Sequence, residues 1–213
     1  MKGSTHLAIG VAIGAAASLY YPFSITNAAA YVTVAAISAL SADLDGPSLL
    51  TSKIGKLSKF VYGLIQLSGW LLIGTIIYLY VTDRYFNVSL TGLAGAIVLI
   101  GVAANQGFIR NALVSLIGGC LIFAGFYSEM IWLAGFGLFV AWAPWLKHRG
   151  MTHTIWAAAL WGVIAYDLEQ HLQLEGIMRV AILGYFSHLI ADTLTPNGVK
   201  WLYPIFKKSF TLH

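Results

Sequence analysis

The stretch that decides the fold is FGLFVAWAPWL-KHRGMTH-TIWAAALWGVIAY, residues 136–166. Two runs without a charged residue, 136–146 and 154–166, flank a basic, histidine-bearing turn at 147–153. Two imidazoles, two cations and a glycine within seven residues would be costly against lipid. The stretch therefore predicts two membrane-embedded helices, with the turn forming one wall of a site at the membrane edge.

The composition of the whole chain supports this interpretation. Of its 213 residues, 59% are hydrophobic and only 9% are charged, whereas about 25% of the residues in a soluble domain are charged. So few charges cannot cover a globule in water. An all-α, polytopic membrane helical bundle is predicted, and the net charge of +4 is interpreted as an orientation signal rather than a nucleic-acid footprint.

A membrane-spanning helix needs roughly 17–25 mainly apolar residues. Eight segments approach this length: 6–21, 27–42, 60–80, 89–104, 111–127, 129–145, 152–166 and 177–193. The loops are short, so residues 1–213 are predicted to form a single integral-membrane domain. Residues 194–213 combine a turn signal at Pro196-Asn197-Gly198 with an apolar stretch too short to span, and are interpreted as an interfacial C-terminal flap or a simple amphipathic anchor.

The lysines and arginines fall unequally on the two sides that these spans define. One side receives Arg84 and Arg179, and the other receives Lys2, Lys53, Lys56, Lys59, Arg110, Lys147, Arg149, Lys200, Lys207 and Lys208. Cytoplasmic loops of membrane proteins carry an excess of these residues. A multi-pass protein of the inner or plasma membrane, with both termini cytoplasmic, is therefore predicted.

Seven histidines and aspartates fall on this same cytoplasmic side, although only lysine and arginine were used to assign it. They end or begin four different predicted elements and are His6, Asp43, Asp45, His148, His153, His188 and Asp192. His188 and Asp192 are four residues apart and so share one helix face. Gly46-Pro47 ends the second helix, so that both preceding aspartates can reach one centre from a turn. Thr152 is predicted to cap the seventh helix. His171 is predicted to lie with Asp167, Glu169 and Glu175 in a loop on the opposite side, and His213 is the last residue, so both histidines are set aside.

Imidazole and carboxylate together suit a divalent metal, zinc in the first place and manganese or iron as alternatives. Seven ligands exceed the four of one tetrahedral ion, so one to three ions are expected, with some residues as outer hydrogen-bonding partners or bases. Asp43 and Asp45 are candidates for both ligand and general base, and Arg149 for a clamp on a negatively charged substrate. Taken singly, each feature also has a plainer interpretation, such as a surface histidine, helix-ending acids or a structural hydrogen-bonded pair.

Four motifs occur in order along the chain: THLAIG (5–10), ADLDGP (42–47), HRGMTH (148–153) and HLIADTLTPNG (188–198). Together they resemble the bacterial family of LexA-regulated, membrane-bound hydrolases that are predicted to depend on metal. The resemblance runs from residue 5 to about residue 204. Thr154 stands where the family often has serine, so a hydroxyl is retained.

The resemblance implies a reaction class. The family is distantly similar to zinc-dependent phospholipase C and single-strand nucleases, all-helical enzymes whose histidines and aspartates hold clustered zinc ions that cleave phosphoesters. A metal-dependent hydrolase acting on a lipid or lipid-linked phosphoester is therefore expected.

The sequence is also compatible with two other functions. One is a transporter, and the other is a metal staple, a non-catalytic membrane protein in which a bound metal only holds the cytoplasmic helix ends together. The middles of the predicted spans are nearly free of ionisable groups, which disfavours transport. Cleavage of a soluble substrate, including nucleic acid, is also open, but the sequence shows no pattern of interleaved aromatic and basic residues, so no nucleic-acid partner is expected. The oligomeric state is left undetermined.

The topology gives a first prediction. Reporter fusions at residues 24, 86, 128 and 171 should report the external side of the membrane, because each follows an odd-numbered or precedes an even-numbered predicted span. Fusions after residues 2 and 147 provide the cytoplasmic control. A cytoplasmic signal at two of the four external positions would rule out the eight-span map.

Overall fold

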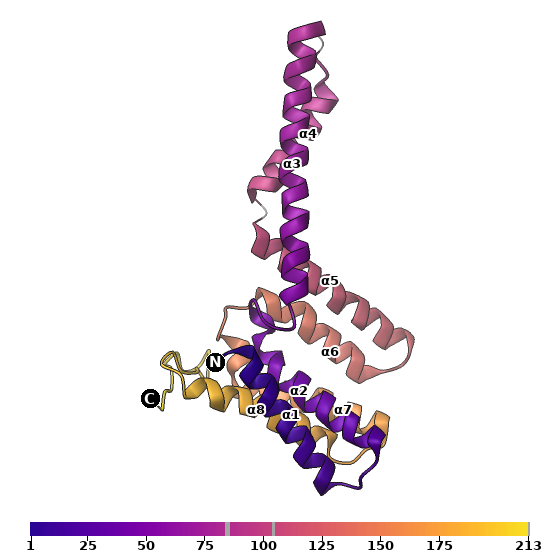
Figure 1. The fold of residues 1–213 in the computed structure, drawn as a ribbon, viewed down its shortest axis with the longest axis vertical. Helices are drawn as coiled ribbons and strands as arrows, with labels where there is room; N and C mark the ends of the chain where they lie inside the picture. Colours follow the sequence, from indigo (N-terminus) through magenta and orange to yellow (C-terminus); the bar gives the residue numbers. More distant parts are fainter. Residues whose placement is uncertain (84–85, 104, 213) are drawn as a thin grey trace. The chain divides into compact units, whose positions relative to one another are not determined.

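The structure is a computed structural model that describes residues 1–83, 86–103 and 105–212. Within these residues it is helical (Figure 1), and an isolated β-bridge joins Val199 to Phe210. The α-helices are α1 (Gly3–Tyr20), α2 (Ile25–Ser41), α3 (Ser52–Asp83), α4 (Val88–Ala103), α5 (Gln106–Tyr127), α6 (Ile131–Trp142), α7 (Ile155–Leu172) and α8 (Ile177–Thr193). Three short 3-10 helices are η1 (Ala42–Asp45), η2 (Ala143–Trp145) and η3 (Met151–His153). The predicted all-α class is confirmed.

Each of the eight predicted spans corresponds to one α-helix, but α3, α5 and α7 extend beyond the predicted bounds, and α6 ends at Trp142, before its predicted end. Helix α3 begins eight residues before the predicted span, because the segment around Lys53, Lys56 and Lys59 is helical although it is too polar for lipid. Helix α7 continues to Leu172, so Asp167, Glu169 and His171 belong to its last turns. The prediction that they lie in a loop is wrong. Polar residues lie just outside the predicted bounds of these helices, because hydropathy marks the lipid boundary and not the end of a helix.

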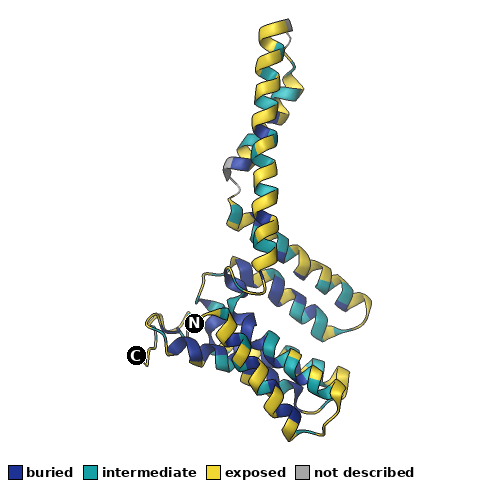
Figure 2. Ribbon diagram, viewed as in Figure 1, coloured by how far each residue is buried: buried dark blue, intermediate teal, exposed yellow. Residues whose placement is uncertain are grey.

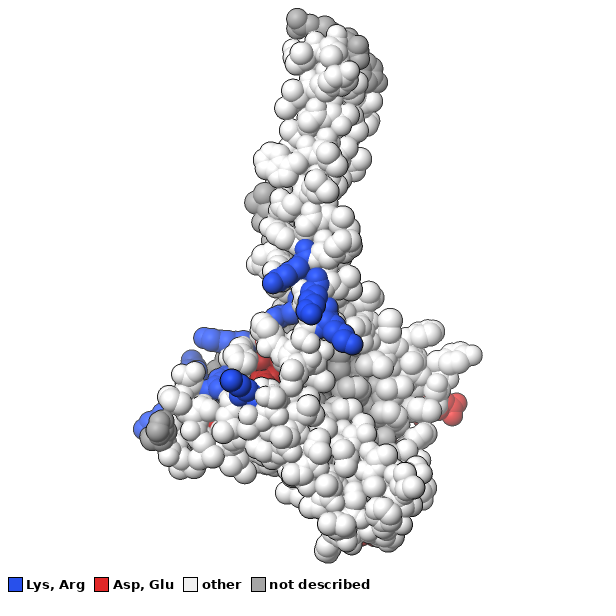
Figure 3. Space-filling view, in the orientation of Figure 1, with Lys and Arg blue, Asp and Glu red and all other residues white. Residues whose placement is uncertain are grey.

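Four helical segments are long and apolar enough to cross a membrane: α1, α2 continued by η1, α3 and α5. Helices α4 and α6 are apolar but shorter. Among the described residues, α7 and α8 do not meet these criteria, so the eight-span map remains a prediction. Wide areas of the surface carry no charged side chain (Figure 3), as expected of helices that face lipid.

The chain forms two compact units. Unit 1 comprises residues 1–51 and 114–213, and unit 2 comprises residues 52–113. In unit 2, α3 and α4 pack against each other. Gln66 Nε2 donates to the Gly101 carbonyl at 2.9 Å, which satisfies the amide inside an apolar helix pair. All seven predicted site residues belong to unit 1.

Helix α8 is the centre of unit 1, where it contacts α1, α2 and α7. Ten of its residues are buried, and the buried segments of the ribbon gather around it (Figure 2). Gly184 permits the close approach to α2, because a Cβ there would lie 2.7 Å from the Ala35 carbonyl oxygen. The close packing fixes the height and rotation of His188, one turn further along the helix.

Candidate metal site

The structure brings the seven predicted histidines and aspartates together at one end of unit 1. They come from four places: the first turns of α1, the short helix η1, residues 148–153, and the last turns of α8. Their donor atoms form three overlapping groups, each within 4.8 Å: His6–Asp43–His188, His153–His188–Asp192 and Asp43–Asp45–His148.

At the centre of this cluster, His153 and His188 face each other through their Nε2 atoms, which are 3.3 Å apart. His188 Nδ1 lies 2.7 Å from the Ala39 carbonyl oxygen. Because a carbonyl can only accept, Nδ1 carries the proton of the neutral ring and Nε2 presents a lone pair. His153 Nδ1 similarly lies 3.0 Å from Thr152 Oγ1, whose hydroxyl donates to Asp45. Two lone pairs at this distance repel each other unless a proton or a metal ion is shared between them.

Two carboxylates lie beside the facing histidines. Asp43 Oδ1 is 3.6 Å from His188 Nε2 and 3.7 Å from His153 Nε2. Asp192 Oδ2 is 3.8 Å from the Nε2 atoms of both histidines. A tetrahedral zinc ion with bonds of ~2.1 Å keeps its ligand atoms about 3.4 Å apart. The separations of these donors therefore fit a divalent metal.

His6 offers a further imidazole to the same cluster. Its buried ring stacks on His188 with 3.8 Å between centroids, and its Nε2 lies 3.4 Å from Asp192 Oδ1. Neither ring nitrogen has a hydrogen-bond partner among the described residues. A buried polar group without a partner costs about 1–3 kcal/mol. A metal ion bound to His6 would remove this cost.

Asp45 holds the outer edge of the cluster. Its Oδ1 accepts from His148 Nδ1 at 2.8 Å, while its Oδ2 accepts from Thr152 Oγ1 at 2.6 Å and from the Arg149 backbone N–H at 3.0 Å. Both oxygens are thus engaged by the protein. A carboxylate in this position fixes the orientation and tautomer of the histidines that bind a metal. The geometry therefore favours Asp45 as a positioning residue and Asp43 as the aspartate that faces the centre.

His148 lies at the exposed rim, with 57% of its side chain accessible. Its hydrogen bond to the Asp45 carboxylate raises the pKa of the His148 imidazole. The only other exposed part of the cluster is Asp43, at 18% of its side chain, whereas the remaining donors are buried. The cluster therefore opens to its surroundings on the side of Asp43 and His148.

Two cations pair with Asp192. The Met1 α-amino group contacts its Oδ1, and Arg149 Nη2 lies 3.0 Å from its Oδ2. The Arg149 guanidinium also donates to Thr195 Oγ1 and to the Gly198 carbonyl, and it is only 21% exposed. Arg149 has a φ of 57°, in the left-handed region, which costs on the order of 1–2 kcal/mol for a residue with a Cβ. Contacts of both its backbone and its side chain hold that conformation.

Residues 194–212 lie beside the cluster. The predicted turn is confirmed, because the Gly198 N–H donates to the Thr195 carbonyl at 3.0 Å. Trp201 Nε1 donates to Thr193 Oγ1, and the Leu212 N–H donates to the Thr193 carbonyl, so the segment folds back onto the end of α8. The interfacial position of this flap stays a prediction.

The sequence assigned one hydroxyl wrongly and missed several contacts. It predicted Thr152 as the cap of the seventh helix, but Thr154 caps α7 by accepting from the Ala157 N–H, while Thr152 links His153 to Asp45. The Ala39 carbonyl and the Met1 amine carry no sequence signal, because every chain has such backbone groups. Of the residues set aside, His171 lies against Trp132 with ring centroids 6.1 Å apart, and His213 lies outside the described residues, as does Arg84.

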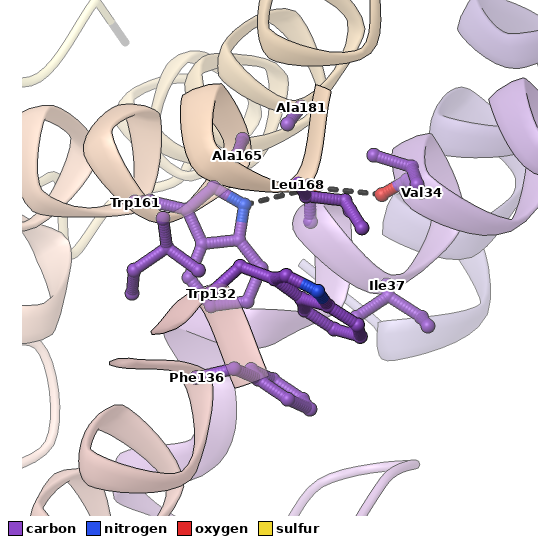
Figure 4. A pocket seen from close by; sticks show the side chains of 10 residues that line it. Val34, Ile37, Trp132, Phe136, Trp161, Ala165, Leu168 and Ala181 are labelled. Atoms are coloured by element: carbon purple, nitrogen blue, oxygen red, sulfur yellow. Dashed lines mark hydrogen bonds between the residues drawn. The ribbon is translucent and has the colours of Figure 1, made fainter. Parts of the chain in front are cut away.

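A small apolar pocket occupies a different part of unit 1, between α2, α6, α7 and α8 (Figure 4). Its volume is about 90 Å³, and its walls include Val34, Trp132, Phe136 and Trp161. The only hydrogen bond drawn there runs from Trp161 Nε1 to Ser38 Oγ, at 2.9 Å. Its lining residues include no acid, histidine or cysteine, so this pocket offers no further metal ligand.

A family model described as YdjM inner membrane protein matches residues 1–213, the whole chain. The chain belongs to the YdjM inner membrane protein family. Membership of this family and the long apolar helices together place the chain in a membrane. No curated protein and no solved structure matches it. LexA regulation, hydrolase activity and a relation to phospholipase C remain expectations from the resemblance.

Metal binding by the YdjM-family chain gives a second prediction. Purified protein should bind zinc, and Asp192→Ala should bind much less, because the substitution removes a carboxylate beside both Nε2 atoms. Asp45→Asn leaves the facing donors in place but loosens the histidines, so zinc affinity should fall about 10- to 100-fold. Competition with a chelator, read by elemental analysis, measures both effects.

The matched control is His171→Ala, which removes an imidazole from the same unit but outside the cluster. It should bind zinc as the wild type does. Equal zinc affinity in all four proteins would contradict the site.

Proposed function

We propose that the protein is a membrane-bound, metal-dependent hydrolase that acts at the cytoplasmic membrane face on a phosphoester of a lipid or lipid-linked substrate. The observation that supports this most strongly is the pair of inward-facing Nε2 atoms beside a partly exposed carboxylate, Asp43. Buried lone pairs would bind the ion, and the exposed acid is free to act on a substrate. The resemblance to phosphoester-cleaving enzymes supports the reaction class.

His153, His188 and Asp192 would hold the metal, with His6 as a further donor and Asp43 beside them. The overlapping groups accommodate one to three ions, and a donor set of imidazoles and carboxylates favours zinc over manganese or iron. When bound, the divalent ion would polarise the phosphoryl oxygen and lower the pKa of a bound water toward ~7. Asp45 and Thr152 would keep His148 and His153 in the tautomer that binding requires.

In the proposed reaction, a water oxygen attacks phosphorus and the ester P–O bond breaks. Asp43 accepts one proton from the water, and that proton passes to the departing alkoxide, which leaves as an alcohol. The other product is the phosphate acid. Asp45 contributes by positioning His148 and His153, and not as the base. Arg149 would stabilise the negative charge of the phosphoryl group once substrate competes with Asp192 for its guanidinium.

The proposed location rests on the charge distribution. With both termini cytoplasmic, the cluster lies at the level of the cytoplasmic headgroups, since it is built from the first turns of α1 and the last turns of α8. A lipid phosphoester would meet the site at that depth. The buried histidines and aspartates of the described residues all belong to this cluster and form no path along the bundle, so transport is disfavoured.

A metal staple is the second candidate, and burial favours it. Four donors, His6, His153, His188 and Asp192, are almost inaccessible, and a structural metal site is closed by protein ligands whereas a catalytic one keeps an open position. The two functions differ in the role of Asp43: in a staple it would be a further ligand that closes the site, whereas in a hydrolase it would act as the base.

Substitution of the two aspartates gives a third prediction. Asp43→Asn should lower hydrolysis of phospholipids or phosphodiesters about 10²–10⁴-fold, the range for loss of a general base, while most of the zinc is retained by the other donors. Asp45→Asn should lower zinc affinity and activity together, because it acts through the histidines. Initial rates on detergent-solubilised protein at saturating zinc separate the two.

His171→Ala again serves as the control. If fully zinc-loaded wild type cleaves nothing on a broad panel, and both aspartate variants lose thermal stability in step with zinc, the staple is the correct function.

A further inference from the structure

An apolar groove lies between α1 and α8 at the end of unit 1 opposite the metal site. Ile13, Ala16, Ala17, Tyr20, Val180 and Leu183 line it, and its volume is about 540 Å³, within the range of ~300–1,000 Å³ typical of ligand sites. His6 lies in the first turn of α1 and Tyr21 follows its end, so the two lie about 22 Å apart at 1.5 Å per residue. The groove is therefore separate from the histidine–aspartate cluster.

The polar end of the groove is held firmly in place. Tyr21 stacks on Tyr31 with ring centroids 5.3 Å apart, and the Tyr31 hydroxyl donates to the Glu175 carbonyl at 2.6 Å. Gly176, with a φ of 91°, packs directly beneath the Tyr21 ring, where a Cβ would overlap it. These contacts keep the Tyr21 hydroxyl beside the start of α8.

Arg179 supplies a cation at this end. Its Nη1 donates to the Tyr21 hydroxyl at 3.3 Å, which is the one contact of its guanidinium with the described residues, although the group has five N–H donors. The carboxylates of Glu169 and Glu175 interact with it electrostatically. Glu169 already caps α8 by accepting from the Met178 N–H, whereas the exposed Glu175 side chain makes no ion pair in the described part of the chain.

We infer that this groove binds one glycerophospholipid with a zwitterionic, primary-ammonium headgroup. An acyl chain lies along the apolar walls, the phosphate accepts from Arg179 and the Tyr21 hydroxyl, and the ammonium donates to Glu175. A headgroup that is only anionic would meet two carboxylates without an ammonium to compensate them. A choline headgroup carries no N–H to donate. The charges at the rim thus select phosphatidylethanolamine over phosphatidylglycerol and phosphatidylcholine.

The test uses the full-length protein, delipidated in detergent and titrated with each of these three lipids carrying the same acyl chains. Lipid retention is read by native mass spectrometry and the melting temperature by intrinsic fluorescence. Phosphatidylethanolamine should bind most tightly and stabilise most. Arg179→Gln should weaken its binding about 10- to 100-fold, as expected for lost charge-assisted hydrogen bonds, while Lys207→Gln, an exposed cation outside the groove, should change nothing.

Two further variants distinguish recognition of the lipid headgroup from binding of the acyl chain. Glu175→Gln should abolish the preference over phosphatidylglycerol without abolishing binding, and Ala16→Trp, which fills the groove, should reduce binding of all three lipids. Zinc content should be unchanged in every variant, which shows that the chain still folds and keeps this inference independent of the hydrolase proposal. Equal binding of the three lipids by wild type, a preference for phosphatidylglycerol, or equal effects of Arg179→Gln and Lys207→Gln would overturn the inference.

Discussion

The central constraint on the structure is a cluster of hydrogen-bond acceptors that repel one another inside an apolar bundle. His153 and His188 present Nε2 lone pairs to each other at 3.3 Å, with the carboxylates of Asp43 and Asp192 3.6–3.8 Å away. In surroundings of low polarity such a concentration of acceptors is unfavourable unless a cation is shared among them. A divalent ion bound to His153, His188 and Asp192 would relieve this repulsion and would leave Asp43 beside it as the base. The metal is therefore central to both the stability and the chemistry that we propose.

The bundle is built so that these side chains cannot turn away. The Ala39 carbonyl at the end of α2 fixes His188 from one side, and Asp45, only a few residues later, fixes His148 and His153 from the other. The buried helix α8 carries both His188 and Asp192, and its close contact with α2 at Gly184 sets their position. Metal affinity and packing would therefore be coupled, because a shift of α8 against α2 would move the candidate ligands and their hydrogen-bond partners together.

Most of the helices and all seven members of the cluster could be predicted from the sequence, because hydropathy marks apolar segments and ionisable residues are rare enough in them to be conspicuous. The separate roles of Asp43 and Asp45 could not be predicted from the sequence. Asp43 and Asp45 differ only in which neighbours the 3-10 turn η1 brings to each, and those neighbours are over 100 residues away. The same limit explains the exchange of Thr152 and Thr154: both are hydroxyls before an apolar helix, and only the position of Asp45 decides which one caps α7. The full length of α7 was missed because its last turns carry Asp167, Glu169 and His171, which hydropathy excludes from a span.

X-ray absorption spectroscopy at the zinc edge of the purified, zinc-loaded protein tests the central claim most directly. The account predicts a first shell of nitrogen and oxygen atoms at about 2.0–2.1 Å, with the outer scattering of at least two imidazoles. One imidazole contribution should disappear in His153→Ala, but none in His171→Ala. A sulfur shell at about 2.3 Å, or a spectrum unchanged by His153→Ala, would place the metal elsewhere and contradict the account.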